Sequence, residues 1–134
     1  MVKKNNFGYF QVFFVLLVDK SYKMYDNINM KLPGINWTDN KNTLNKQEHG
    51  LSFEAAQYVF TDPERLERFD RSENNTSTEE RWQTLGMVDK VLFVVYTERG
   101  VDKHIITARL ADKTERRSYN GYYKIDGKGW TKAT

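Results

Sequence analysis

The side chains best suited to chemistry in this sequence are arginines, lysines, tyrosines, glutamates and two histidines, scattered along the chain rather than gathered in one short motif. Such residues can cleave RNA without a metal, because the 2′-hydroxyl of the substrate is itself the nucleophile. The protein must then accept that proton, stabilise the charged phosphorane and protonate the leaving 5′-oxygen. Arginine offers a rigid fork for phosphate, and histidine has the pKa closest to neutral. Candidates for proton transfer are His49, Tyr96 and Glu98.

Each of these three candidates also has an ordinary structural explanation. His49 precedes a glycine, and a histidine there can bond the last carbonyl groups of a helix. Tyr96 lies in an apolar run that is typical of a core strand. Glu98 and Arg99 can form an exposed ion pair at a hairpin. From the residues alone, both interpretations stay open.

Other chemistries lack their sequence motifs. The chain has no cysteine, which excludes disulfides, iron–sulfur clusters and thiolate metal sites. Its two histidines are far apart and no HExxH occurs, so metal catalysis has little support. Neither a phosphate-binding glycine loop nor the GxSxG of serine hydrolases is present. We therefore expect no cofactor.

The positive charge of the protein is concentrated towards its C-terminus. The formal net charge is only +3, but residues 99–134 contain nine Lys or Arg against four Asp or Glu. Such a surface attracts a polyanion such as RNA by releasing counterions. A solvated surface with a chance surplus of charge explains the same numbers, and Arg116 and Arg117 can be a solvated helix face.

Hydrophobic periodicity predicts an α+β domain. Helices are expected at 39–49, capped by Asp39 and ended by Gly50, at 52–60, and from a capping box of Asp112 and Glu115 to about Tyr119. Alternation with a period of two indicates strands at 66–71 and 104–110, and the apolar run at 91–97 indicates a central strand joined by a short turn to the strand before it. The strands are expected at 66–71, 81–87, 91–97 and 104–110. Two N-terminal helices, a small antiparallel sheet and a C-terminal helix follow from this order.

The length of 134 residues fits one domain. Residues 7–18 form an apolar run too short to cross a bilayer. Three interpretations are open for this run: a weak export signal, an extra strand or helix of the fold, or upstream sequence included by a wrongly placed start codon. We favour the last, because the domain pattern begins after Met30. We expect a non-domain extension at 1–30, a domain at 31–122, and a tail without clear period at 123–134.

Four segments together resemble the BrnT family. They are residues 37–63, the EERW of 79–82, the VVYTERG of 94–100, and residues 105–120. The resemblance implies a RelE-like fold and a ribonuclease toxin of a type II toxin–antitoxin system, which inhibits translation and growth. It also implies a BrnA-like ribbon-helix-helix antitoxin, and operator DNA bound only through the complex with that antitoxin. A cytoplasmic location without a membrane partner is expected; export or membrane association rests on residues 7–18 alone.

The resemblance also implies which residues act. Arg81, Arg99 and Arg109 come from adjacent predicted strands or their ends, and we expect them to converge on one phosphate. The expected catalytic residues are His49, Arg81, Tyr96, Glu98, Arg99 and Arg109.

A second group of residues is expected to bind RNA by its charge. Its members are Lys41, Arg71, Lys113, Arg116 and Arg117.

Two positions depart from the family pattern. Glu48 stands where a lysine usually precedes the histidine, and Leu110 stands where a second arginine is common. Either change is expected to weaken RNA binding. The alternative function is therefore that of a catalytically weak or inactive member that holds the antitoxin and acts in operon autoregulation.

Overall fold

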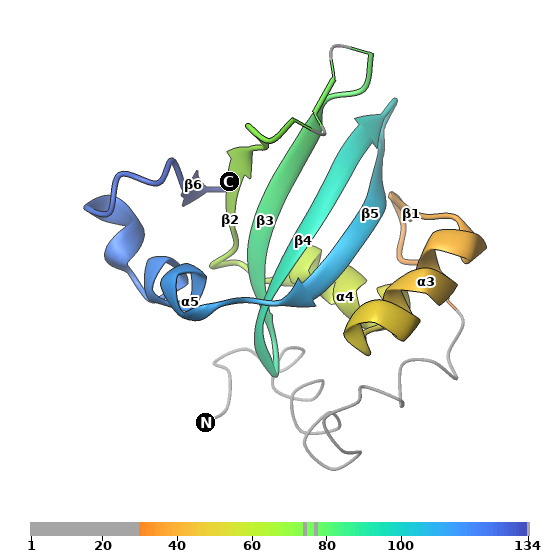
Figure 1. Cartoon of the computed structure of the whole chain (residues 1–134), viewed down its shortest axis with the longest axis horizontal. Helices are drawn as coiled ribbons and strands as arrows, with labels where there is room; N and C mark the ends of the chain where they lie inside the picture. Colours follow the sequence, from red (N-terminus) through yellow and green to blue (C-terminus); the bar gives the residue numbers. More distant parts are fainter. Residues whose placement is uncertain (1–29, 74, 77, 134) are drawn as a thin grey trace.

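The computed structural model describes residues 30–133 except 74 and 77, and a six-stranded sheet forms its centre (Figure 1). The strand order is β1-β5-β4-β3-β2-β6. The strands are β1 (Ile35–Asn36), β2 (Leu66–Phe69), β3 (Arg81–Val88), β4 (Lys90–Arg99), β5 (Asp102–Leu110) and β6 (Thr131–Lys132).

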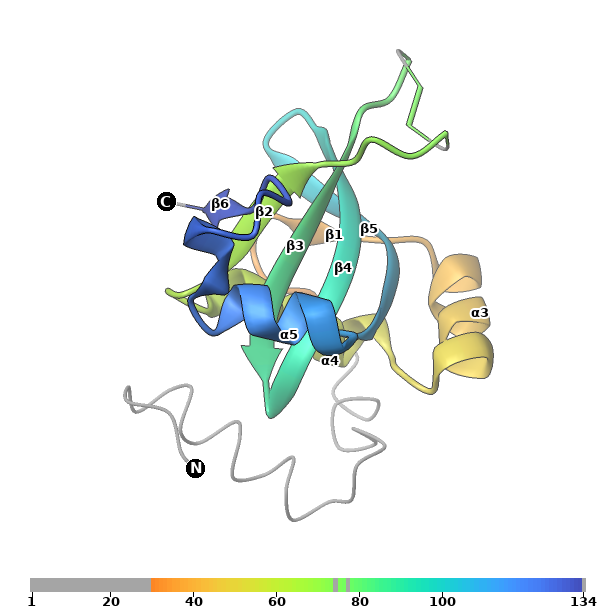
Figure 2. The same ribbon diagram turned by 60° about the vertical axis from the view of Figure 1, so that its left-hand side comes forward.

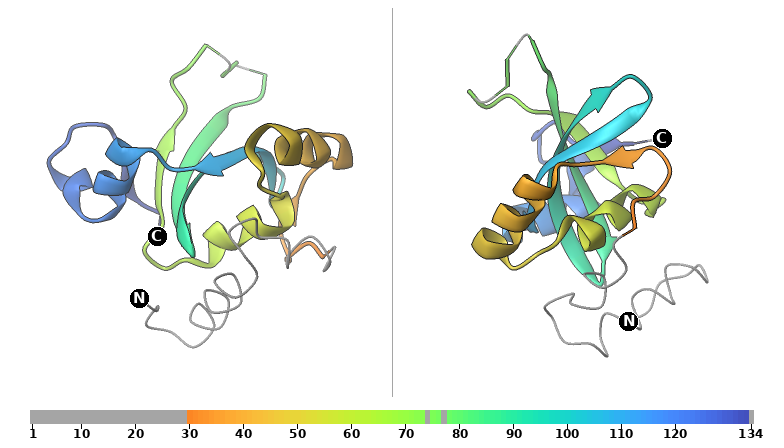
Figure 3. Two further views of the ribbon diagram at one scale, coloured as in Figure 1. Left: turned by 60° about the horizontal axis from the view of Figure 1, so that its bottom comes forward. Right: turned by 90° about the vertical axis from the view of Figure 1, so that its right-hand side faces the viewer.

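Helices lie on both sides of this sheet. They are α3 (Asp39–His49), α4 (Phe53–Ala56) with the 3-10 helix η1 (Gln57–Thr61), α5 (Lys113–Tyr119), and the 3-10 helix η2 (Tyr122–Lys124). In Figure 2, α5 crosses one face of the sheet while α4 lies behind it. Figure 3 shows α3 beside the edge formed by β5 and β1. The expected α+β class is confirmed.

The sheet is mixed, so the prediction of a purely antiparallel sheet was wrong. The strand β1 pairs parallel with β5, with Ile35 opposite Lys103 and Asn36 opposite His104. The remaining pairs are antiparallel. A strand of two residues is too short to show periodicity, so its partner and direction depend on tertiary packing alone.

The central strand β4 buries both of its faces. Leu92 and Val94 pack with α4 and η1, and we call this side of the sheet the α4 face. Phe93 and Val95 pack on the opposite side with Trp130, and we call this side the α5 face. Because residues of a strand alternate between faces, an apolar run such as β4 belongs in the middle of a sheet.

The helix boundaries follow local hydrogen bonding. Gly50 ends α3 with φ of 67°, a left-handed conformation that glycine adopts without strain. The capping box of Asp112 and Glu115 at α5 is confirmed. The N-cap of α3 is Thr38, however, not the expected Asp39, because the Thr38 hydroxyl accepts a hydrogen bond from the Lys41 amide at 3.3 Å.

The C-terminal segment joins the sheet, although the sequence shows no period there. Strand β6 pairs with β2, and Trp130 is only 3% exposed and meets Phe93 edge to face. One tryptophan and a two-residue strand leave no repeating pattern for sequence reasoning to detect. Residues 123–133 therefore contribute to the core on the α5 face.

The predicted extension at 1–30 falls outside the described residues, apart from Met30. The Met30 carbonyl accepts a hydrogen bond of 2.7 Å from Gln57 Nε2. Among the described residues, no helix has the length and apolar character needed to span a bilayer.

Candidate nucleic-acid interface

The helix α5 covers only one end of the α5 face (Figure 2). At the other end, near the β4–β5 turn, Arg99 is exposed and Arg81 and His104 are partly exposed, while Thr97 between them is buried. Strand pairing places Arg81 opposite Thr97, and Thr97 opposite His104. These three residues therefore form a row across three neighbouring strands, with their side chains on the same side of the sheet. We call the part of the α5 face from Gln83 to the β4–β5 turn the open half.

Two arginines of the open half act on the carboxylate of Glu79, and only Arg99 contacts it. Arg99 Nε donates to Glu79 Oε2 at 2.6 Å, and both side chains are partly exposed. This hydrogen bond, followed by the charges of Arg99 and Arg81, lowers the pKa of Glu79. The Arg81 side chain is half-buried and makes no hydrogen bond or ion pair within the described part of the chain. An arginine in this situation keeps its N–H donors available to an anion such as phosphate.

His104 is the residue of the open half that sequence reasoning missed. Burial lowers its pKa, and the charge of Arg99 lowers it further. Its Nε2 atom is buried and has no hydrogen-bond partner among the described residues. Two features of the sequence could have drawn attention to it. His104 is one of only two histidines in the chain, and it begins the strand predicted at 104–110. Only the register across β4 shows that His104 lies in line with Arg81.

Arg109 does not join Arg81 and Arg99, so the expected convergence of the three arginines was wrong. Arg109 pairs with Phe93, whereas Arg99 lies six residues further along β4, roughly 20 Å at ordinary strand rise. The physical reason is the strand direction. Arg99 lies at the C-terminal end of β4 and Arg109 near the C-terminal end of β5, and the C-terminal ends of antiparallel neighbours point in opposite directions.

A carboxylate and an aromatic ring hold Arg109 in place. Its Nη1 and Nη2 donate to the two carboxylate oxygens of Glu115 at 2.9 and 3.0 Å. Its guanidinium carbon lies 3.9 Å from the centre of the Phe93 ring. Arg109 thus ties the end of β5 to the first turn of α5, which is a structural contact.

Tyr96 lies in the core on the α4 face. It is 2% exposed, meets the Phe60 ring edge to face, and donates its hydroxyl to Glu67 at 3.2 Å. Burial, with the Glu67 charge as a smaller cause, raises the pKa of Tyr96 to about 12. Glu98 is exposed at the end of β4, 3.3 Å from Lys103 Nζ. The structure brings neither side chain to the Arg81 row.

The other expected residues lie at several places on the surface. His49 and Lys41 are exposed on α3, which packs against β5. Lys113, Arg116 and Arg117 are exposed on α5. Arg116 Nη1 donates to the Ala111 carbonyl, and Arg117 stacks over Tyr122. Arg71 follows β2 and lines a hollow next to the open half.

Arginines on one sheet surface of a small α+β fold form a basic patch, the kind of surface to which nucleic acids bind. Residues 37–115 match the family model "Ribonuclease toxin, BrnT, of type II toxin-antitoxin system". This match covers more than half of the chain, so the protein belongs to the BrnT family of ribonuclease toxins.

Two further comparisons complete this picture. The 1.1 Å crystal structure of the Brucella abortus ribonuclease toxin BrnT is similar over 59% of this chain and 96% of that chain, with 18% identity and a TM-score of 0.43. A likeness of this degree carries no argument about the site. No curated protein matches the sequence. Within the described residues, no group of three or more His, Asp or Glu side chains is placed to hold a metal ion.

Proposed function

We propose that this protein is a toxin that cleaves RNA on the open half of the α5 face by a metal-free reaction. Membership of the BrnT family supports the activity. The observation that places the cleavage site here is the row of Arg81, Thr97 and His104. Arg99 lies two residues beyond Thr97 on β4, so its side chain is on the same face. This row combines cations for a phosphate with a group that titrates near neutrality.

In the proposed reaction, Arg81 and Arg99 bind the non-bridging oxygens of the scissile phosphate and stabilise the charge that develops on them. Glu79 positions Arg99 through its hydrogen bond of 2.6 Å. His104 accepts the proton of the 2′-hydroxyl through Nδ1, since its Nε2 atom is buried. The 2′-oxygen forms a bond to phosphorus as the bond to the 5′-oxygen breaks, and the leaving 5′-oxygen takes a proton from water. The pKa of His104 is lowered. The imidazole is therefore neutral at pH 7, as a proton acceptor must be.

The same proposal includes partners and a place of action. A ribbon-helix-helix antitoxin would neutralise the protein in the cytoplasm, and the complex would bind operator DNA. RNA cleavage would inhibit translation and growth. The RelE-like assignment of the fold belongs to this proposal as well, since the order of two helices, sheet and closing helix supports it.

A second candidate is a member that has lost catalysis and retains only antitoxin binding. Its support is Glu48, an exposed acid next to His49, together with Leu110, which is 47% exposed at the end of β5. Both residues replace positive charge with acidic or apolar surface.

The test compares a labelled oligoribonucleotide with the same oligonucleotide carrying 2′-deoxyribose throughout, in the presence of EDTA. We expect cleavage of the first and none of the second, with a 2′,3′-cyclic phosphate at the new end. Loss of cleavage upon chelation would contradict the metal-free mechanism. A folded protein that binds its antitoxin and cleaves no RNA would favour the second candidate.

A further inference from the structure

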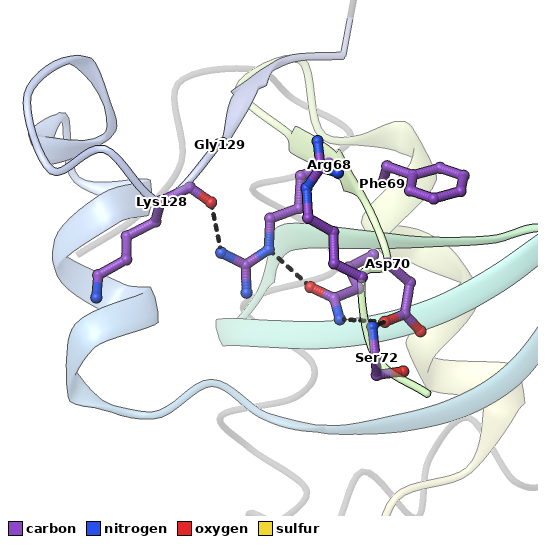
Figure 4. Close-up of a pocket in the computed structure, with 8 residues that line it drawn as sticks. Arg68, Phe69, Asp70, Ser72, Lys128 and Gly129 are labelled. Atoms are coloured by element: carbon purple, nitrogen blue, oxygen red, sulfur yellow. Dashed lines mark hydrogen bonds between the residues drawn. The ribbon is translucent and has the colours of Figure 1, made fainter. Parts of the chain in front are cut away.

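A hollow of about 320 Å³ adjoins the open half at the end of β2 (Figure 4). Its walls include Arg68, Arg71 and Gln83 from the sheet region, and Lys128 and Gly129 from the C-terminal segment. The last two residues lie outside the part of the chain that matches the BrnT family model. The C-terminal segment of this chain therefore builds a surface that the matched residues do not supply.

Arg68 is fixed at the centre of this hollow. Its Nε donates to Gln83 Oε1 and its Nη1 to the Lys128 carbonyl, both at 2.7 Å. Its guanidinium carbon lies 4.1 Å from the centre of the Trp130 ring. In Figure 4 the Lys128 carbonyl faces Arg68 while the Lys128 ammonium points away. Nη2 of Arg68 has no hydrogen-bond partner within the described residues, so a fixed donor remains for a ligand.

Asp70 is the carboxylate of the hollow, and its charge stabilises the Arg68 guanidinium together with the charges of Glu115, Asp126 and Asp112. Asp70 is 3% exposed, and its Oδ1 already accepts from the Ser72 amide at 2.9 Å and from Gln83 Nε2 at 3.2 Å. Arg71 is exposed, and its side chain makes no hydrogen bond or ion pair within the described part of the chain. The hollow therefore presents two guanidinium groups, one fixed and one adaptable, to an anion.

The hollow continues directly from the Arg81 row. The Asp70 amide donates to the Arg81 carbonyl at 3.0 Å. Arg68 lies in register with Gln83 and Val95, so it is two strands from Arg99, about 10 Å across the sheet, and four residues, about 13 Å, along it. A single-stranded RNA that crosses the strands from His104 towards β2 would pass both arginines.

The geometry points to this hollow as a subsite for a phosphate that flanks the scissile phosphate of an RNA chain, held by Arg68 and Arg71. This assignment rests on the proposed function, since it takes the RNA path from the open half. The continuity with that row favours RNA over an acidic protein segment. Arg68 and Arg71 thereby contribute to substrate affinity, whereas Arg81 acts at the reacting group.

The test measures binding of fluorescein-labelled oligouridylate carrying 2′-deoxyribose at every position, which cannot be cleaved, by the full chain and by Arg71→Ala. Lys124→Ala is the matched control, because Lys124 is exposed near α5 and does not line the hollow. We expect Arg71→Ala to weaken binding several-fold and to reduce the slope of log affinity against log salt by about 0.7, the value of one lost phosphate contact on a single strand. Lys124→Ala should change neither.

Cleavage provides the second measurement. Arg71→Ala should raise the half-saturating concentration of long oligouridylate without changing the maximal single-turnover rate. The dinucleotide UpU is too short to reach the hollow, so wild type and variant should cleave it equally. Arg68→Gln should behave like Arg71→Ala, with its thermal midpoint recorded because Arg68 also joins β2 to the C-terminal segment.

Several outcomes separate the two proposals. If Arg71→Ala and Lys124→Ala bind oligouridylate equally, the subsite is overturned. If Arg71→Ala weakens only antitoxin binding, the hollow serves the partner protein and the subsite is also overturned. If wild type cleaves nothing but the binding difference persists, the proposed catalysis fails while the subsite stands.

Discussion

Some arginine side chains of this protein are paired with another protein group, and others have no such partner among the described residues. Arg109 has a bidentate contact with Glu115, whereas Arg81 has no side-chain partner within the described residues. Both arginines lie at strand ends and both match the family pattern, so their sequence context does not distinguish them. Only the pairing across the sheet decides which arginine is structural.

Arg109→Lys is expected to reduce stability and to leave cleavage nearly unchanged. Lysine keeps one ion pair with Glu115 but loses the second hydrogen bond and the stacking on Phe93. We expect a loss of about 1–2 kcal/mol in the free energy of unfolding, measured with urea. A rate of cleavage about a hundredfold lower, with unchanged stability, would instead place Arg109 at the transition state.

The pH dependence of cleavage tests His104. A base must be neutral to accept a proton, so the rate should be constant above the pKa of His104 and fall as the pH drops through it. Since burial and Arg99 lower that pKa, the acid limb should lie below about 6.5, the ordinary value for histidine. His104→Asn should slow the reaction and remove this limb.

His49→Asn is the matched control, because His49 is exposed at the end of α3. It should retain the acid limb. If His49→Asn removes the limb and His104→Asn retains it, the proton acceptor lies on α3 and the assignment to His104 is wrong.

At the scale of elements, β3 approaches η1 unusually closely. A Cβ atom added at Gly86 would lie 2.7 Å from Cβ of Val59 and 3.0 Å from its backbone. Gly86→Ala should therefore force these elements apart and cost about 1–3 kcal/mol of stability, seen as a lower urea midpoint. An unchanged midpoint would show that η1 shifts freely and that this contact does not fix the packing.

The elements that the sequence predicts are those with strong local signals. Alternation indicates β5, the continuous apolar run indicates β4, and the Asp112–Glu115 capping box marks α5. The second N-terminal helix was predicted as one unit but is a single α-helical turn followed by η1. The two-residue strands β1 and β6 depend on distant partners, so no local pattern reveals them.

At the scale of the whole molecule, the C-terminal segment completes the α5 face. Trp130→Ala is expected to lower the free energy of unfolding by about 3–5 kcal/mol, because a buried aromatic side chain is removed from the core. Lys132→Ala is the control, since its ion pair with Glu64 is largely exposed and such pairs contribute little. Equal thermal midpoints for the two variants would mean that the segment packs only loosely.

The candidate site was only partly predictable from the sequence. The residue types and the arginines Arg81 and Arg99 follow from the sequence and its resemblance to the BrnT family. The role of His104 and the separation of Arg109 depend on strand register and direction, which arise when distant segments pair. The end of the α5 face that α5 does not cover likewise results from where α5 and the C-terminal segment pack.

The most direct test of the central claim is single-turnover cleavage of an oligoribonucleotide by Arg81→Lys, with Arg117→Lys as the matched control on α5. Lysine keeps the charge but loses the planar fork, so Arg81→Lys should cleave about a hundredfold more slowly with nearly unchanged RNA affinity and thermal midpoint. Arg117→Lys should cleave at the wild-type rate. Full activity of Arg81→Lys would contradict the account and place the reaction outside the open half.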